Sequence, residues 1–177
     1  MKIFHFSLVL TEVGVTTPGL EDALFEVGCD DALVCFYNQS AYLVFDREAE
    51  SLREAVASAV ADVESSSCGA RVVSVDAGDL VGLSDIAELS GLTRQAVALL
   101  KDGKRGGGQF PAPVLRLEGR QPLWKWSQVA QWLVEQGRVG AELAENALVV
   151  DEFNQALELR NSGRMESILS LVESIAR

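Results

Sequence analysis

The sequence predicts a chain of the mixed α+β class, divided into three regions at residues 1–78, 79–136 and 137–177. Three observations support this prediction. In the first region, strand-like alternation and helical spacing follow one another in the order β-α-β-β-α-β. In the second region, a pair of short helical patterns meets at a glycine, and in the third region a pair of apolar stripes at helical spacing is separated by Asn161-Ser162-Gly163.

The chain begins with an expected strand over residues 2–12, in which the apolar side chains of one face alternate with polar ones such as His5 and Ser7. The apolar face consists of Phe4, Phe6, Leu8 and Leu10. A helix is expected to begin at Thr17-Pro18, because Thr is a good N-cap and Pro is favoured in the first helical position. Gly28 is expected to end this helix.

Residues 33–37 and 42–45 are rich in β-forming side chains and are joined by a short connection, Asn38 to Ala41, which predicts an antiparallel hairpin. Ser51 and Glu54 have the spacing of a capping box and predict the start of a second helix. Residues 71–75 predict the last strand. The resulting order, β-α-β-β-α-β, indicates a ferredoxin-like sheet with two helices on one face.

No catalytic motif is visible in this first region, so we expect no enzyme activity and no bound cofactor. The adjacent pair Asp30-Asp31 follows a helix-ending glycine, which favours a solvated turn over a metal or catalytic site. The sequence has no cleavable leader pattern and no apolar run of membrane-spanning length, so we expect a soluble cytoplasmic protein.

Three cysteines and a single histidine, His5, fit no zinc-ligand spacing, so no metal site is expected. The cysteines stand among apolar or small residues, which predicts buried, reduced thiols. A redox sensor is the alternative. The cysteines are Cys29, Cys35 and Cys68.

The second region contains the spacing of a helix-turn-helix. Ser84 is the expected N-cap of the first helix, and Thr93 is the expected N-cap of the second. A small residue is needed where two such helices cross and a flexible one in the turn, and Ala87 and Gly91 stand at these places. The side chains expected to be buried in the first helix are Ile86, Ala87 and Leu89. The second helix carries Ala96, Val97, Leu99 and Leu100, and Val97 is expected to fill the angle between the two helices.

Residues 83–133 resemble the small winged helix-turn-helix domains of MerR-like and excisionase-like (AlpA-type) DNA-binding proteins. The matching segments are DIAELSGLTRQAV, FPAPV at Phe110 to Val114, and LWKWSQVAQWL at Leu123 to Leu133. The resemblance implies that FPAPV opens a β-hairpin wing, that the tryptophan at its end packs on the helices, and that a third helix follows. The chain departs from the family pattern in two ways: the domain is internal, and the loop KDGKRGGGQ is long and glycine-rich.

The resemblance implies that the second helix enters the major groove of double-stranded DNA. Arg94 and Gln95 at its start are then placed to reach base edges, and the alternative is that both are exposed polar residues of no function. Positive side chains on a mobile glycine-rich segment, and Arg120 at the tip of a hairpin over residues 114–124, are expected to touch the DNA backbone, with the minor groove as an alternative for Arg120. The expected contact residues are Thr93, Arg94, Gln95, Lys101, Lys104, Arg105, Arg120 and Lys125.

Tryptophans in this region are expected to pack in the core rather than to stack on bases, because Trp124 and Trp132 are embedded in apolar patterns.

The net charge of −11 is unusual for a DNA-binding protein. Residues 80–134, however, carry seven basic and four acidic side chains, a net charge of +3, so the rest of the chain sums to −14. An acidic body would restrict DNA contact to the basic region, or the acids serve only solubility.

The third region predicts a helical hairpin, with one apolar stripe that includes Phe153 and Leu157 and a second that includes Ile168 and Val172. Such a surface either folds back on the rest of the chain or pairs with a second copy. We expect it to hold a homodimer, with the sheet of the first region as the competing interface. The sequence therefore predicts a sequence-specific DNA-binding protein, a bacterial or phage transcription regulator that binds an inverted repeat. An excisionase-like architectural protein and a protein-interaction adaptor without DNA affinity are the alternatives.

Overall fold

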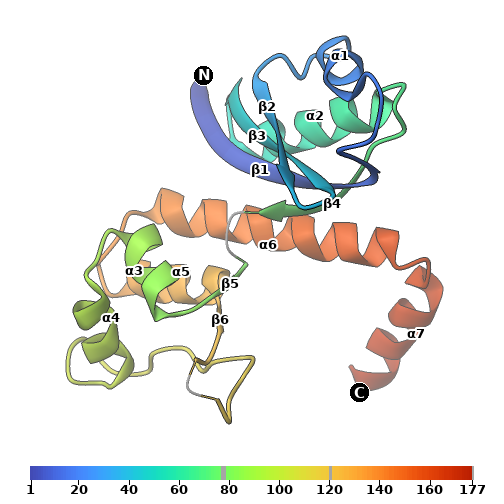
Figure 1. Ribbon diagram of the computed structural model, residues 1–177. Coiled ribbons are helices and arrows are strands. Elements are labelled where there is room, and N and C mark those ends of the chain that lie inside the picture. The colour runs from blue at the N-terminus through green and yellow to red at the C-terminus, as the bar shows by residue number, and fades with distance from the viewer. Residues whose placement is uncertain (77–78, 120, 177) are drawn as a thin grey trace. The chain divides into compact units, whose positions relative to one another are not determined.

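The computed structural model describes residues 1–76, 79–119 and 121–176 (Figure 1). It confirms the α+β class, because the described residues form a four-stranded antiparallel sheet, a two-stranded sheet and seven helices. The chain divides into two compact units, one of Met1–Ala77 with Glu152–Arg177 and one of Gly78–Asp151. The expected division into three regions stays a prediction, and the residues after 136 contribute to both units.

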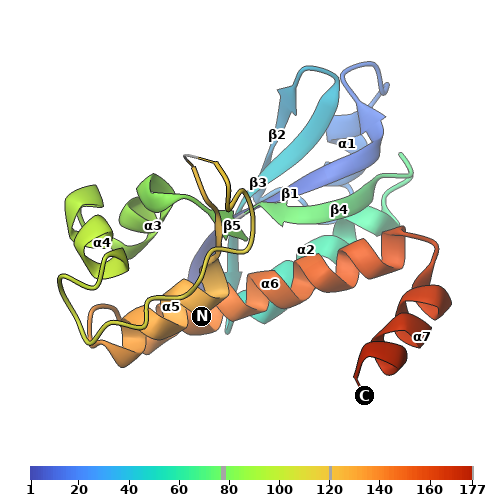
Figure 2. The ribbon, with the colours of Figure 1, turned by 90° about the horizontal axis from the view of Figure 1, so that it is seen from below.

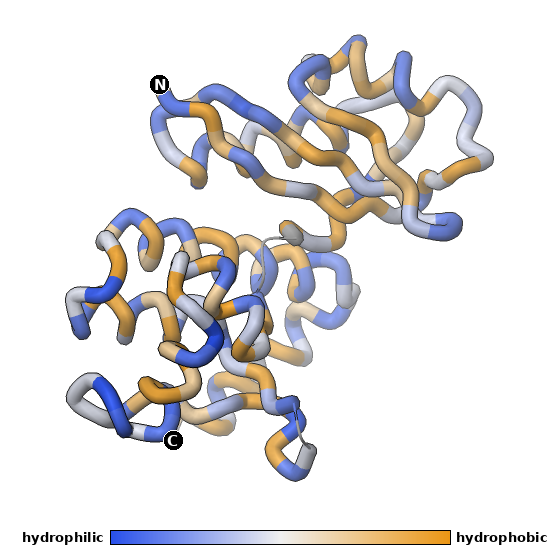
Figure 3. Tube along the Cα trace, turned by 60° about the vertical axis from the view of Figure 1, so that its left-hand side comes forward, coloured by the Kyte–Doolittle hydropathy of each residue, from blue (hydrophilic) through white to orange (hydrophobic). Residues whose placement is uncertain are grey.

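The larger sheet lies in the first unit and consists of β1 (Lys2–Gly14), β2 (Ala32–Tyr37), β3 (Ser40–Ala49) and β4 (Arg71–Asp76). Its strand order is β2-β3-β1-β4, and every neighbouring pair is antiparallel. The connection between β2 and β3 is shorter than expected, because Asn38 adopts a left-handed conformation with φ 53° and closes a two-residue turn with Gln39. Polar and apolar residues are interspersed along these strands (Figure 3).

One face of this sheet is buried by α1 (Leu20–Phe25) and α2 (Leu52–Ser65). The expected alternation of β1 is confirmed, with Phe6, Leu8 and Leu10 buried. Ser51 caps α2 as expected, since its hydroxyl accepts a hydrogen bond from the amide of Glu54. On the opposite face of the sheet, side chains such as Leu33 and Val44 are exposed.

The first helix begins later than the sequence suggested. Its N-cap is Gly19, with φ 65°, and its first residue is Leu20. The expectation for Thr17 was wrong, because its hydroxyl accepts a hydrogen bond from the amide of Gly14 and its own amide donates to the carbonyl of Gly14. The hydroxyl and amide of Thr17 therefore close a turn after β1 and do not cap the helix.

A buried arginine, which sequence analysis did not anticipate, joins three segments of the first unit. Arg47 of β3 is only 6% exposed. Its guanidinium donates to both carboxylate oxygens of Asp31 at 2.7 and 2.9 Å and to Asp62 at 2.7 Å. It also donates to Ser58 and to the carbonyl of Gly28. These carboxylates raise its pKa, with the hydrogen bonds to Asp31 as the main cause.

The cysteines only partly meet the expectation of buried thiols. All three are free, but Cys29 is buried while Cys35 and Cys68 are half-buried. Burial raises the pKa of the Cys29 thiol to about 11, so this thiol stays protonated at neutral pH.

The outer edge of β4 is covered by polar side chains from the later turns of α6 (Ala141–Asn161), as Figures 1 and 2 show. The side-chain amide of Asn154 accepts from the backbone amide of Val75 and donates to its carbonyl. Arg160 and Asn161 both donate to the carbonyl of Val72. These bonds satisfy backbone groups that an open sheet edge would leave unpaired.

The second unit contains β5 (Leu80–Val81), α3 (Leu83–Ser90), α4 (Arg94–Lys101), β6 (Trp124–Lys125), α5 (Trp126–Glu135) and the first turns of α6. The short strands β5 and β6 pair antiparallel. The chain ends with α7 (Met165–Ile175) in the first unit. Within the described ranges, no helix is long and apolar enough to cross a membrane.

Candidate nucleic-acid interface

Helices α3 and α4 are joined by a tight turn at Gly91, which has φ 68° and ends α3. Thr93 caps α4 as expected, since its hydroxyl accepts from the amide of Ala96 at 3.1 Å. The expectation that Ser84 caps α3 was wrong. The helix begins at Leu83, and the carboxylate of Asp85 accepts from the amide of Gly82 at 2.8 Å, so a charged side chain replaces the expected hydroxyl at this end.

The two helices bury the side chains expected at their crossing, with Ile86 and Val97 both fully buried. Leu89, which we expected to be buried, is 37% exposed. The buried stripe of α3 passes through Ile86 and Ala87, and Leu89 lies beside this stripe on the helix surface.

Helix α5 and the segment before it complete the core of this unit. Trp124 and Trp132 are buried, which confirms core packing as their place. The indole N–H of Trp124 donates to the carbonyl of Pro111 at 2.9 Å, and the ring of Phe110 packs edge-on against both tryptophans. The FPAPV segment is therefore anchored to α5.

Residues 114–123 turn back on themselves between FPAPV and β6. The amide of Val114 donates to the carbonyl of Leu123 at 2.8 Å, and Leu115 and Leu123 form a single antiparallel bridge. The amide of Gly119 donates to the carbonyl of Arg116, which has a left-handed conformation with φ 58°. Arg120, the expected tip residue, lies outside the described residues.

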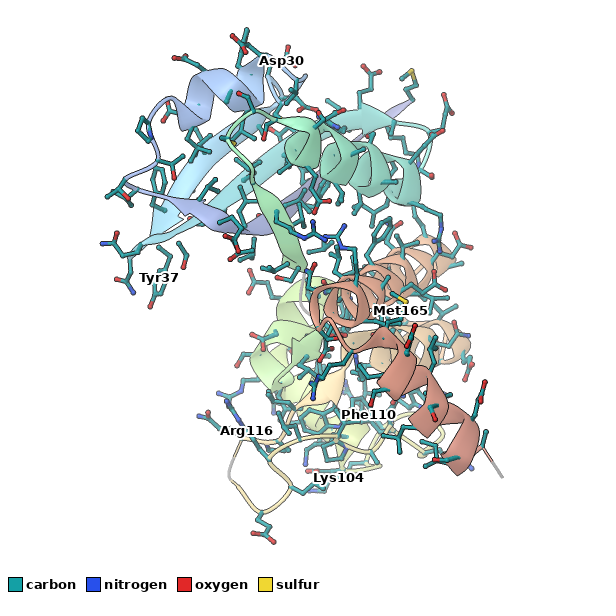
Figure 4. The ribbon with its side chains drawn as sticks, turned by 90° about the vertical axis from the view of Figure 1, so that its right-hand side faces the viewer. Asp30, Tyr37, Lys104, Phe110, Arg116 and Met165 are labelled. Atoms are coloured by element: carbon teal, nitrogen blue, oxygen red, sulfur yellow. The ribbon has the colours of Figure 1, made fainter. Side chains whose placement is uncertain are left out.

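Arg94 and Gln95 lie exposed in the first turn of α4, beside the capping residue Thr93. Sequence analysis missed Arg116, which lines the same hollow as Arg94. This hollow has a volume of about 290 Å³ and is formed by the start of α3, the start of α4 and the turned-back segment. Figure 4 shows the Arg116 side chain extending from that segment. Arg116 could have been found from the sequence, because it stands beside the expected hairpin turn in a basic stretch.

The residues after α4 form what we call the basic loop, residues 102–109, and hydrogen bonds join it to the neighbouring helices. The amides of Lys104 and Arg105 both donate to the carbonyl of Leu99, at 2.9 and 3.1 Å. Further along, the amide of Gly107 donates to the side-chain carbonyl of Gln136 at 3.1 Å. The loop is thereby attached to the end of both α4 and α5.

Close packing explains the glycine at position 106. A Cβ atom there would lie 3.2 Å from Leu100 and 3.5 Å from Trp132, and the φ of 74° disfavours other residues. Two positive side chains, Lys104 and Arg105, are exposed on this loop, and Figure 4 shows Lys104 extending from it. Lys101, at the end of α4, pairs with Asp102 at 2.5 Å.

Lys125 has a different environment from the other expected contact residues. Its ammonium group donates to Asp79 at 2.9 Å and to Asp151 at 2.8 Å, and Ser127 donates to the second oxygen of Asp151 at 2.9 Å. Burial alone would lower the pKa of Lys125, but the bonds to Asp151 and Asp79 outweigh it and raise the pKa. The charge of Lys125 is therefore neutralised inside the unit.

Among the described residues, no group of three or more His, Cys, Asp or Glu side chains is placed to hold a metal ion. Comparisons with protein-family models, with curated proteins and with solved structures found no match for this chain. The geometry of the second unit is therefore the basis for any assignment of function.

Proposed function

We propose that the second unit is a winged helix-turn-helix that binds double-stranded DNA in a sequence-dependent way, and that the protein is a bacterial or phage transcription regulator. The observation that carries this proposal is the first turn of α4. Arg94 and Gln95 are exposed there on a helix whose other face is fixed by Val97 and Leu100 in the core. Arginine and glutamine are suited to two-point hydrogen bonding with guanine and adenine in the major groove.

The surroundings of α4 support a division of labour on the DNA. Lys104 and Arg105 on the basic loop, and Arg116 on the turned-back segment, flank the helix with positive charge. In this proposal residues 114–123 form the wing, because they turn back to a bridge between Leu115 and Leu123. These flanking cations touch phosphates, which positions α4 without reading sequence. Lys125 is left out of the contact surface because two carboxylates bind it.

For the first unit we propose a ferredoxin-like arrangement. The order β2-β3-β1-β4, the antiparallel pairing of every neighbour and the two helices against one face support it. This topology serves many functions, so it contributes no assignment of a ligand or effector. In the proposed regulator, two copies of the chain bind the two halves of an inverted repeat, because a single small module reads too few base pairs to select one genomic site.

Selection from a pool of random duplex DNA by the full chain tests the proposal. We expect enrichment of one short sequence motif, and we expect the double variant Arg94→Ala/Gln95→Ala to lose that enrichment while it still retains duplex DNA. Arg71→Ala is the matched control, since it removes an exposed positive charge from the first unit. If the wild-type chain retains no DNA, the proposal is wrong and the protein-interaction adaptor is favoured. Strong bending of the selected duplex would favour the excisionase-like architectural role.

A further inference from the structure

Helix α7 presents an apolar surface that is largely exposed, with Ile168 as its half-buried member. It contains no buried residue. Five of its apolar side chains are between 45% and 73% exposed, namely Met165, Leu169, Leu171, Val172 and Ile175. By contrast, Leu157 in α6 is buried within the first unit and Phe153 is half-buried. Of the two apolar stripes of the predicted hairpin, the one on α7 is therefore the more exposed and the better placed to bind a partner.

The chain changes direction between α6 and α7 through a defined turn. Gly163 has φ 65°, and the hydroxyl of Ser162 accepts from the amide of Arg164 at 3.0 Å. Figures 1 and 2 show α7 leaving the end of α6 and extending away from the sheet. An isolated helix of 11 residues is marginal in water, so its stability calls for a surface to pack against.

The spacing of the apolar residues specifies the kind of surface. Met165, Ile168, Val172 and Ile175 recur at intervals of three, four and three residues, which is the spacing of a two-helix coiled-coil interface. We call these four residues the α7 stripe. Leu169 and Leu171 lie on either side of it, whereas Glu166, Ser170 and Glu173 lie on the opposite half of the helix.

We propose that α7 pairs in antiparallel orientation with α7 of a second copy of this chain. A two-fold axis that passes near Ser170 places Met165 opposite the partner's Ile175 and Ile168 opposite the partner's Val172. Each of these facing pairs then consists of two apolar side chains of similar size. The stripe is thus complementary to itself, which is what a two-fold symmetric contact requires.

Charge also favours the antiparallel orientation. The helix dipoles are opposed in the antiparallel pair, whereas a parallel pair places like ends of the two helices side by side.

The area of this contact sets the expected strength of the dimer. A contact between two helices of 11 residues is small beside the roughly 1,200–2,000 Å² of a stable, specific interface. The free protein should therefore exist as monomer and dimer in a concentration-dependent equilibrium. This inference deepens the proposed function, because two linked DNA-binding units on one duplex raise the effective concentration of the second α7 and strengthen a weak pair.

Sedimentation of the full chain without DNA tests the pairing. We expect a concentration-dependent dimer whose dissociation constant rises by about tenfold or more in Val172→Glu, because a charge in the apolar layer loses its hydration. Ser170→Glu is the matched control, since it adds the same charge on the opposite half of α7, and it should leave the dimer nearly unchanged. Because no residue of α7 is buried, both variants should keep the fold, which circular dichroism checks.

Disulfide trapping tests the orientation. A mixture of I168C and V172C chains should form a mixed disulfide dimer faster than either variant forms one with itself, and the wild-type chain measures any background from its own cysteines. A wild-type chain that stays monomeric at all concentrations overturns the proposal, as does an equal effect of the two glutamate substitutions. Faster self-linking of V172C overturns the antiparallel arrangement. DNA binding is measured separately, so loss of the dimer leaves the DNA-binding proposal standing.

Discussion

In the first unit several basic side chains contact carboxylates, whereas in the second unit several basic side chains are exposed to solvent. Arg47 contacts Asp31 and Asp62, and Arg160 forms a two-point pair with Glu64. In the second unit Arg94, Arg105 and Arg116 have no ion pair among the described residues, whereas Lys101 and Lys125 contact carboxylates. The first unit thus uses several of its cations for its own stability, and residues 80–134, with their net charge of +3, leave several cations free for an anionic partner. Whether each basic side chain is paired or exposed therefore indicates more about function than the net charge of the chain does.

Removal of Arg47 should have the largest effect on stability. Arg47→Met leaves Asp31 and Asp62 near one another without their shared cation, so we expect a loss of about 3–5 kcal/mol in the free energy of unfolding. Urea denaturation measures this loss. Arg71→Met, at an exposed position, should change the stability by less than about 0.5 kcal/mol. A small change in both variants would mean that the inward-facing cations of the first unit do not stabilise it.

Substitutions on α4 and on the basic loop should affect DNA binding in different ways. We expect Arg94→Ala or Gln95→Ala to weaken binding to the preferred site by about 1–3 kcal/mol and to relax the preference at particular base pairs. Lys104→Ala should weaken binding to all sequences alike, because a phosphate contact carries no sequence information. Competition titrations with matched and mismatched duplexes distinguish the two effects. Equal, sequence-independent losses from all three variants would place the recognition surface elsewhere.

Two lysines of the second unit, Lys104 and Lys125, should separate stability from DNA binding. Lys125→Met removes the cation between Asp79 and Asp151, so we expect a loss of about 1–2 kcal/mol in the free energy of unfolding. DNA affinity of the folded protein should not change. Lys104→Ala should show the reverse pattern. Reduced DNA affinity with full stability in Lys125→Met would contradict the internal role of this residue.

The contribution of Lys125 also has an expected pH dependence. Its pKa is raised in the folded protein, so the folded state holds the proton more tightly than the unfolded chain does. The stabilisation is therefore present at neutral pH and is lost as the pH rises above the ordinary lysine value of about 10.4.

Release of the basic loop should produce the smallest effect. Gln136→Ala removes the hydrogen bond to Gly107, and we expect DNA binding to weaken by about 0.5–1 kcal/mol for all sequences, because the loop must then be ordered on binding. Gln131→Ala is the matched control, since Gln131 lies on α5 and contacts only Glu135 by an exposed bond. Identical affinities in the two variants would show that the attachment of the loop does not matter.

Structural features that depend on neighbouring residues were predicted correctly from the sequence. The cap at Thr93, the turn at Gly91 and the buried face of β1 each depend on residues a few positions apart, and the structure confirms them. The expected cap at Ser84 was wrong because Asp85 competes for the same helix end, a choice that spacing alone does not decide.

Features that depend on distant residues were not predicted. The carboxylate partners of Arg47 lie 15 or 16 positions away along the chain, and those of Lys125 lie 26 and 46 positions away. A local pattern contains no information about such pairs, so Lys125 was indistinguishable from an exposed lysine. Arg116 was missed for a related reason, because only the folded chain brings it to the same hollow as Arg94.

The salt dependence of DNA binding tests the central claim, that the second unit leaves its cations free for phosphate. With four to six phosphate contacts per chain, log K should fall against log salt concentration with a slope of roughly −4 to −5 per chain. The triple variant Lys104→Ala/Arg105→Ala/Arg116→Ala should reduce the slope by about 3, and Lys125→Met should leave it unchanged. A slope near zero in the wild-type chain, or the same slope in the triple variant, would contradict the account.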